Sequence, residues 1–243
     1  MRSRWLPMAR RPFMWAWIAA LLLASNMAIA RVPKDIDGGK TYTSKTKRFT
    51  VVVPKARNWA VHRFRVREVS HPDFHGRPEE AFFEISDFGE LYRFGVVDLV
   101  PEIRTILKLP ETPNAAEPKP ILEAILRMHY MDKLPGEIRW NSIKEFASSL
   151  GPGAIGLCSV DGGSRLLSLK GEEIAEAAKT GKLPAPKPGE AKIGIVAVLA
   201  GDRLVFALAQ NDYENQTGTD PEASFAAVAT SLAQMMGTAK LGK

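Results

Sequence analysis

The chain has 243 residues, of which 45% are hydrophobic and 25% are charged, and it contains a single cysteine. These proportions are typical of a folded globular protein, and they exclude an intrinsically disordered chain and a small scaffold held together by disulfides. The formal net charge is +6, and four of these positive charges lie in the first thirty residues.

The first thirty residues have the three parts of a secretory signal peptide. Four arginines lie within the first eleven positions, an uncharged apolar run extends from Phe13 to Ala24, and Ala28-Ile29-Ala30 supplies the small residues of a cleavage site. The sequence therefore predicts a signal peptide over residues 1–30, a mature chain beginning at Arg31, and a periplasmic or secreted location. An uncleaved amino-terminal anchor is the alternative interpretation.

Removal of the leader changes the charge of the protein. Four of the 33 basic residues and none of the 27 acidic residues lie in residues 1–30, so the mature chain has 29 basic and 27 acidic residues and a net charge of only +2. This small excess argues against nucleic acid as a partner. No other segment approaches the roughly 20 consecutive apolar residues of a spanning helix, so no stable membrane insertion is expected after cleavage.

The first part of the mature chain has the pattern of β-strands. After a polar, extended stretch over residues 31–47, β-branched and alternating residues predict strands at 49–54 and 59–69. Two further strands, at 81–88 and 91–99, are predicted to form a hairpin around Asp87-Phe88-Gly89-Glu90.

Residues 101–150 are interpreted as a helical insertion. Helices are predicted at 101–108 and 121–134, with a proline-rich loop between them. A third helix is predicted from Ser142 to Leu150, because Ser142 and Glu145 have the spacing of a capping box and Gly151 would end the helix.

The remaining residues predict a further hairpin, two buried strands and a closing helix. The hairpin joins 155–160 to 165–169, and a short helix at 172–179 and a proline-rich connector follow it. The strands 193–199 and 204–209 are apolar at nearly every position, which is typical of central strands covered on both faces. The closing helix begins at Thr219-Asp220-Pro221-Glu222 and ends at Gly237.

Three parts of the chain resemble the PsbP-like family, whose fold is shared with the Ran-binding release factor of yeast and with bacterial envelope proteins of the DcrB kind. The first is Tyr42 with the strand Arg48–Pro54 and the later Trp59; the second is the hairpin Ile193–Asn211; the third is the set Phe225, Val228 and Leu232 of the closing helix. The resemblance implies an antiparallel sheet flanked by helices, a PsbP-like sandwich, and a scaffold that binds a partner without catalysis. The predicted fold is therefore a single α+β domain over residues 31–243 with a helical insertion at 101–150.

Arg63, Arg65 and Arg67 form the candidate partner-binding site. In a strand of period two they lie on one face, where guanidinium groups suit phosphate, anionic lipid or an acidic protein. The alternative is a solvated face whose arginines pair with acids on a neighbouring strand, such as Glu84 or Glu90.

His71, Asp73 and His75 form the candidate metal site. Imidazole and carboxylate at i, i+2 and i+4 would point to one side of an extended segment and suit a transition metal. The alternative is a polar surface loop, because Pro72, Asp73 and Gly76 are turn-forming residues.

Two other motifs are interpreted as structural. Residues 151–156 match G-x-G-x-x-G, but the expected order is helix before and strand after, the reverse of a dinucleotide site. Cys158 lies in an apolar segment, which favours a buried thiol over a nucleophile paired with His129 or His62.

Function is predicted from these patterns together. They favour an exported, non-catalytic binding protein of the cell envelope that engages a protein or envelope component, with no cofactor. The alternatives are a metal-binding protein or enzyme that uses the 71–75 loop, and a structural envelope subunit. No serine-hydrolase, β-lactamase or zincin motif occurs in the sequence, so it favours a protein without catalysis over an enzyme.

Overall fold

A computed structural model describes residues 34–55, 63–85, 90–107, 109, 118–130, 138–161, 190–211 and 221–242. The predicted signal peptide, the turn at 86–89, and the strand and short helix expected within 165–179 lie outside these residues. In the described part of the chain, no helix is long and apolar enough to cross a membrane.

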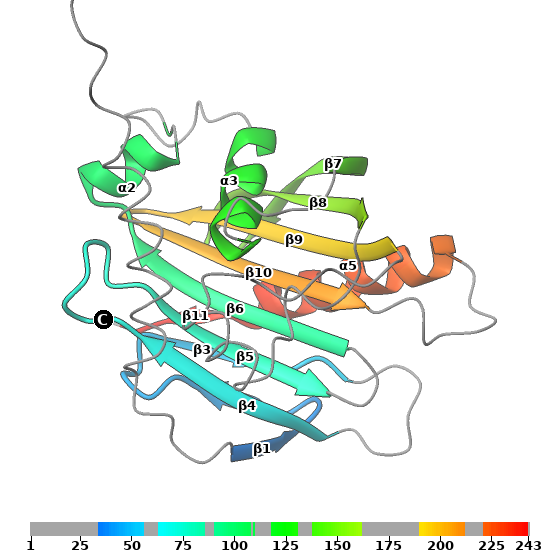
Figure 1. Cartoon of the computed structure of the whole chain (residues 1–243). Coiled ribbons are helices and arrows are strands. Elements are labelled where there is room, and N and C mark those ends of the chain that lie inside the picture. The colour runs from blue at the N-terminus through cyan, green and yellow to red at the C-terminus, as the bar shows by residue number, and fades with distance from the viewer. Residues whose placement is uncertain are drawn as a thin grey trace, which may run out of the picture.

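The main feature of the described structure is one antiparallel sheet of eight strands (Figure 1). In spatial order its strands are β1 (Lys34–Asp37), β4 (Arg63–Ser70), β5 (Glu79–Ile85), β6 (Glu90–Asp98), β10 (Arg203–Asn211), β9 (Glu190–Ala200), β8 (Gly151–Asp161) and β7 (Arg139–Ser148). A second, three-stranded sheet has the order β11 (Lys240–Leu241), β3 (Phe49–Val52) and β2 (Thr41–Thr43).

Helices lie on both faces of the large sheet. Helix α3 (Pro118–Tyr130) packs on β8 and β9, with the short α2 (Pro101–Ile106) near it, and α5 (Pro221–Thr238) packs on β9 and β10 from the other side (Figure 1). The small sheet shares the α5 side, where β3 contacts the helix. The predicted α+β class and antiparallel sheet are therefore confirmed, in a protein richer in sheet than the sequence suggested.

The core is divided by the large sheet into two layers, and the central strands contribute to both. Val196 and Val198 of β9 belong to the layer under α5 and the small sheet, whereas Ile195 and Ala197 belong to the layer under α3. Coverage on both faces explains why this strand is apolar at nearly every position, as its sequence predicted.

The prediction of a helix from Ser142 to Leu150 is wrong, because these residues form most of β7 and the turn from β7 into β8. Ile143 packs toward α3 and Phe146 toward α5, as alternation along a strand requires, and a bulge lies between Trp140 and Ser142. The capping box involves only four residues. Its local stabilisation is smaller than that of the hydrogen-bond ladder with β8, which extends along the whole strand. Among the described residues of the insertion at 101–150, the helices are α2 and α3.

Candidate binding surface

Strand β4 places Arg63, Arg65 and Arg67 on one face of the large sheet. All three are exposed, while Phe64 and Val66 between them are buried against the small sheet. The predicted period-two separation of the two faces is therefore confirmed. The arginines share their face with the even-numbered residues of β5, which extend the surface across the sheet.

Two of these arginines have acidic neighbours. The Nε of Arg63 lies 3.2 Å from the Oδ1 of Asp37 on β1, in an exposed ion pair. Arg65 lies in register between Asp35 of β1 and Glu84 of β5. Cross-strand pairing with acids, which the sequence left open as an alternative, therefore describes the position of these two residues.

Arg67 is held differently, by an aromatic ring. Its guanidinium carbon lies 4.4 Å from the ring centroid of Phe82, and that of Arg93 lies 4.1 Å from the same centroid. Phe82 is directly opposite Arg67 on β4 and Arg93 on β6, so a guanidinium approaches the ring from each neighbouring strand. Such contacts stabilise a cation over an aromatic face. Although Arg67 is exposed as a whole residue, partial burial of its guanidinium against the protein lowers its pKa, and the charges of Glu84 and Glu80 oppose this shift.

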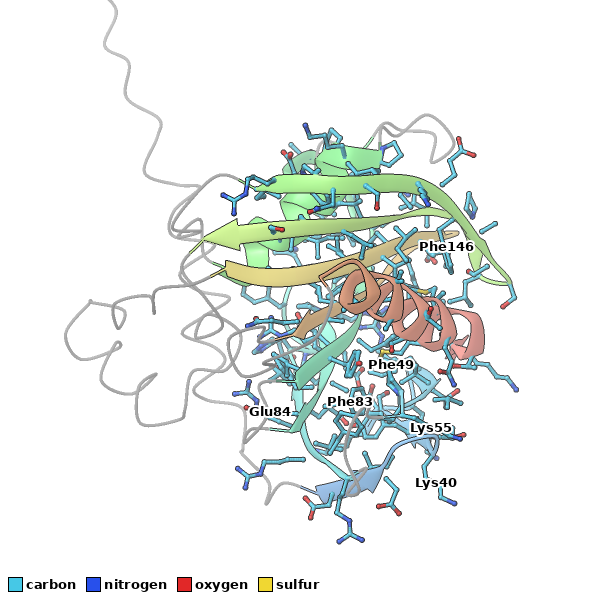
Figure 2. All side chains as sticks on the ribbon, turned by 90° about the vertical axis from the view of Figure 1, so that its right-hand side faces the viewer. Lys40, Phe49, Lys55, Phe83, Glu84 and Phe146 are labelled. Atoms are coloured by element: carbon cyan, nitrogen blue, oxygen red, sulfur yellow. The ribbon has the colours of Figure 1, made fainter. Side chains whose placement is uncertain are left out.

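Among the described helices, none covers this part of the sheet. α3 contacts β7, β8 and β9, at the other end of the same face (Figure 1). Figure 2 shows Glu84 on the arginine side of the sheet, and Phe83 and Phe49 on the side of the small sheet. We call Arg63, Arg65, Arg67, Phe82, Glu84 and Arg93 the arginine face.

The 71–78 loop does not have the extended form on which the metal hypothesis depended. The amide of Phe74 donates to the carbonyl of His71, and the amide of His71 donates to that of Pro78, so the loop folds into turns. His71 is half-buried, with its ring 6.4 Å from that of Phe74, and Asp73 and His75 are exposed. Within the described residues, no three or more His, Cys, Asp or Glu side chains are grouped as metal ligands.

The glycines of the G-x-G-x-x-G match lie within β8, and a strand rather than a helix precedes them. A Cβ on Gly153 would collide with the carbonyl oxygen of Ala197 on β9, and one on Gly156 would collide with the ring of Trp140. These glycines therefore allow close packing between strands and beneath an aromatic side chain. Cys158 of the same strand is fully buried, and burial raises the pKa of its thiol to about 12.

A partly buried charge cluster that no sequence pattern predicted lies at one end of the two sheets. Its centre is Asp98, whose side chain is 12% exposed and forms ion pairs with Arg48, Arg77 and Arg203. Arg48 also donates to the carbonyl of Arg77, and Arg203 donates to that of Gly242 at 2.6 Å. The cluster thus joins the β2–β3 turn, the 71–78 loop, the β9–β10 turn and the carboxyl terminus.

Two further carboxylates lie beside this cluster. Glu68 accepts hydrogen bonds from Tyr42 and from the backbone amide of Lys45, and Glu79 accepts one from Thr46. Each of these acids lies on the apolar face of its strand, two positions from a buried apolar residue. Glu68 continues the series Phe64 and Val66 in β4. Glu79 precedes Ala81 and Phe83 in β5, and Asp98 ends the apolar face of β6 in the same way. An acid on the apolar face of a strand was the sequence signal for this cluster.

A shallow hollow of about 360 Å³ lies between the small sheet, the end of α5 and the β7–β8 turn. Its lining consists of Thr41, Thr50, Val52, Ser149, Gly237, Thr238, Ala239 and Lys240. Lys240 is the one ionisable residue of this described lining, so the hollow does not bring together an acid, a base and a nucleophile.

Comparison with known proteins finds similarity among solved structures. No protein-family profile and no curated protein sequence matches the chain. The structure is similar to the solution structure of cyanobacterial PsbP (CyanoP) from Synechocystis sp. PCC 6803, with a TM-score of 0.44 and 5% sequence identity. The match covers 85% of this chain and 94% of that chain.

Proposed function

We propose that this protein is an exported, non-catalytic binding protein of the cell envelope, built on a PsbP-like scaffold. Its partner is an envelope protein that presents acidic side chains to the arginine face. The observation that carries the proposal is the contact of Arg67 with the ring of Phe82, because it holds a guanidinium in place over the ring before any partner arrives.

Preorganisation is the physical reason for choosing this face. A freely rotating arginine loses side-chain entropy when it binds, at a cost of about 0.5–1.5 kcal/mol for each immobilised side chain. Stacking on Phe82 reduces that cost, while the edge of the planar guanidinium still offers paired N–H donors to a carboxylate. Arg65 lies in the next row of the same face and adds a second cation.

Charge reversal with a matched control tests the proposal. The double variant Arg65→Glu/Arg67→Glu is compared with Lys144→Glu/Lys240→Glu, which has the same change in net charge at exposed positions of β7 and β11. In-cell crosslinking followed by partner identification should lose the partner at least tenfold in the first variant only. Equal capture by both variants, at unchanged melting temperature, would contradict the proposal.

Arg67→Lys separates stacking from charge, because lysine keeps the positive charge but lacks the planar guanidinium. We expect this variant to capture the partner several-fold less well than the unchanged protein.

Equal numbers of partner and protein molecules in the crosslinked product would support a binding protein, whereas a repeating assembly of this chain would favour the structural envelope subunit.

The proposed location rests on cleavage after Ala30. Mass spectrometry of the protein from the envelope or periplasmic fraction should find an amino terminus at Arg31. An intact Met1 in the membrane fraction would instead make this an anchored protein, and would leave the arginine face to be tested in that form.

A further inference from the structure

Three guanidinium groups converge on one carboxylate at the end of the sheets where the β2–β3 turn lies. The side chain of Asp98 accepts hydrogen bonds from Arg48 and, at 2.7 Å, from the Nε of Arg77. The Nε of Arg203 lies 3.6 Å from the same carboxylate. A carboxylate shared in this way has little capacity for further donors, whereas each guanidinium offers several N–H groups. Hydrogen-bond donors therefore outnumber acceptors at this point.

Some of these donors have no acceptor in the described part of the chain. Arg77 uses its Nε and Nη2 on Asp98, which leaves its Nη1. Arg203 donates from its Nη1 to the carbonyl of Gly242 at 2.6 Å, which leaves its Nη2. The side chain of Arg77 is 61% exposed and that of Arg203 is 20% exposed, so solvent reaches both groups. A small ligand can reach them in the same way.

The cluster also carries an excess of positive charge. Its three arginines face Asp98 and, through Arg48, the charge of Glu79, so three positive charges stand against two negative ones when both acids are ionised. Burial lowers the pKa of Arg48, and repulsion from Arg77 and Arg203 lowers it further, against the attraction of the two acids. An anion placed among the arginines would relieve this repulsion.

The neighbouring acids of the described segments do not balance this charge. Asp73 of the 71–78 loop and Asp202 of the β9–β10 turn are exposed, and neither forms an ion pair with the three arginines in the described structure. Glu68, beside the cluster, accepts hydrogen bonds from Tyr42 and from the backbone amide of Lys45 instead. The excess positive charge is therefore available to a ligand.

The backbone holds Arg77 at the cluster in a strained conformation. Gly76 and Arg77 both have a positive φ, of 76° and 41°, and such a value is uncommon for a residue with a Cβ. A Cβ on Gly76 would lie 2.9 Å from the carbonyl oxygen of Asp98, so glycine lets the loop approach the end of β6 closely. Residues held in strained conformations concentrate at binding sites, where the position of a side chain matters more than local stability.

We propose that Arg48, Arg77 and Arg203 form an oxyanion site that binds a phosphate group. A guanidinium pairs its planar N–H donors with the oxygens of a phosphate, and a tetrahedral anion can accept from more than one guanidinium at once. Arg77 and Arg203 supply the accessible donors, and Arg48, whose side chain is 13% exposed, adds a third positive charge.

This site is separate from the arginine face. Asp98 extends the apolar row of Phe94 and Val96 on the small-sheet side of β6, whereas Phe82 and the arginine face lie on the other side of the large sheet. The proposal thus adds a small-anion ligand to a protein whose partner surface lies elsewhere, and the failure of either proposal leaves the other standing.

Arginine side-chain NMR of the unchanged protein tests the proposal directly. With ¹⁵N-labelled arginine at constant ionic strength, inorganic phosphate should shift the Nε–H signals of Arg77 and Arg203 until they saturate, with a dissociation constant in the millimolar range or below. The signal of Arg63, which pairs with Asp37 on β1, should not follow this curve. Shifts of Arg77 and Arg203 that stay linear with phosphate concentration, or that chloride reproduces, would overturn the proposal.

A second titration distinguishes the sources of the phosphate group. Glycerol 3-phosphate carries the same group on an organic molecule. Binding several-fold tighter than that of inorganic phosphate would support a phosphomonoester ligand, and equal binding would support free phosphate as the ligand of the same site. Saturation by neither compound would overturn the proposal.

Neutral variants provide a further test. Arg77→Gln removes an exposed guanidinium and should weaken phosphate binding by about tenfold or more, whereas Lys144→Gln removes the same charge from an exposed position of β7 and should leave binding unchanged. Phosphate should raise the melting temperature of the unchanged protein and of Lys144→Gln, and not that of Arg77→Gln. Equal binding by the two variants would contradict the site, and if Arg77→Gln does not fold, the NMR titration of the unchanged protein decides.

Discussion

The stacked ring of Phe82 gives a prediction that joins stability to binding. The side chain is 7% exposed and contacts two guanidiniums, those of Arg67 and Arg93. Phe82→Leu keeps an apolar side chain at this position but removes the aromatic face. Each cation–π contact at a partly exposed site is worth about 0.5–1 kcal/mol, so the loss of both should lower the unfolding free energy by about 1–2 kcal/mol.

Urea denaturation at 25 °C measures this change, and a double-mutant cycle isolates its cause. Combining Phe82→Leu with Arg67→Gln should give a coupling free energy of about 0.5–1 kcal/mol, the value of one contact. The slope of the free energy against urea concentration should stay unchanged, since the same surface is exposed on unfolding. A coupling below about 0.3 kcal/mol, within the range of independent sites, would refute the stabilising role of the stack.

Phe83→Leu is the matched control on the next residue of β5. Phe83 faces the other side of the sheet, where its ring meets that of Tyr42 edge-on at 5.2 Å. This variant should also lose stability, by about 0.5–1.5 kcal/mol from the ring contact and more from the lost packing. It should leave capture of the partner unchanged, whereas Phe82→Leu should reduce it. If both variants reduce capture equally, the arginine face has no special role.

Three further predictions concern the core and the charge cluster. Gly153→Ala should destabilise the protein by about 1–3 kcal/mol in urea denaturation, because the added Cβ would meet the backbone oxygen of Ala197. Gly237→Ala, whose added Cβ would enter open space, should instead stabilise helix α5 by up to about 1 kcal/mol. Cys158, whose thiol pKa is raised to about 12 by burial, should resist maleimide at pH 8 until urea unfolds the protein, and rapid labelling of the native protein would contradict its burial. Asp98→Asn should cost about 3–5 kcal/mol by leaving three arginines around an uncharged side chain, and a loss below about 1 kcal/mol would show that solvent screens the cluster.

Local patterns predicted most of the elements that were described. The run at Phe49, the alternation from Phe64 to Arg67 and the periodic stripe of the closing helix each give the correct element, because each pattern is also the pattern of burial. The short strands β1, β2 and β11 were not predicted as strands, and β7 was predicted as a helix. In β7, Ile143 and Phe146 are three positions apart, a spacing compatible with a helix or with opposite faces of a strand.

For the candidate sites, the sequence alone determined which residues share a face. Period two placed Arg63, Arg65 and Arg67 on one face of β4. It also indicated that Glu79 is a buried acid, since Glu79 lies on the same face of β5 as Ala81 and Phe83. That Phe82 would support Arg67 required knowledge of the register between β4 and β5, which alternation within a single strand does not contain.

Only the tertiary structure decided which distant residues meet. Thr46 and Glu79 are 33 positions apart, and Arg48 and Asp98 are 50 apart, so their contacts depend on how the small sheet packs against the large one. The same holds for β7, which is a strand because β8 is available to pair with it. Burial and periodicity are properties of one segment and can be read from sequence, whereas pairing and charge proximity are properties of two segments and arise only when the chain has folded.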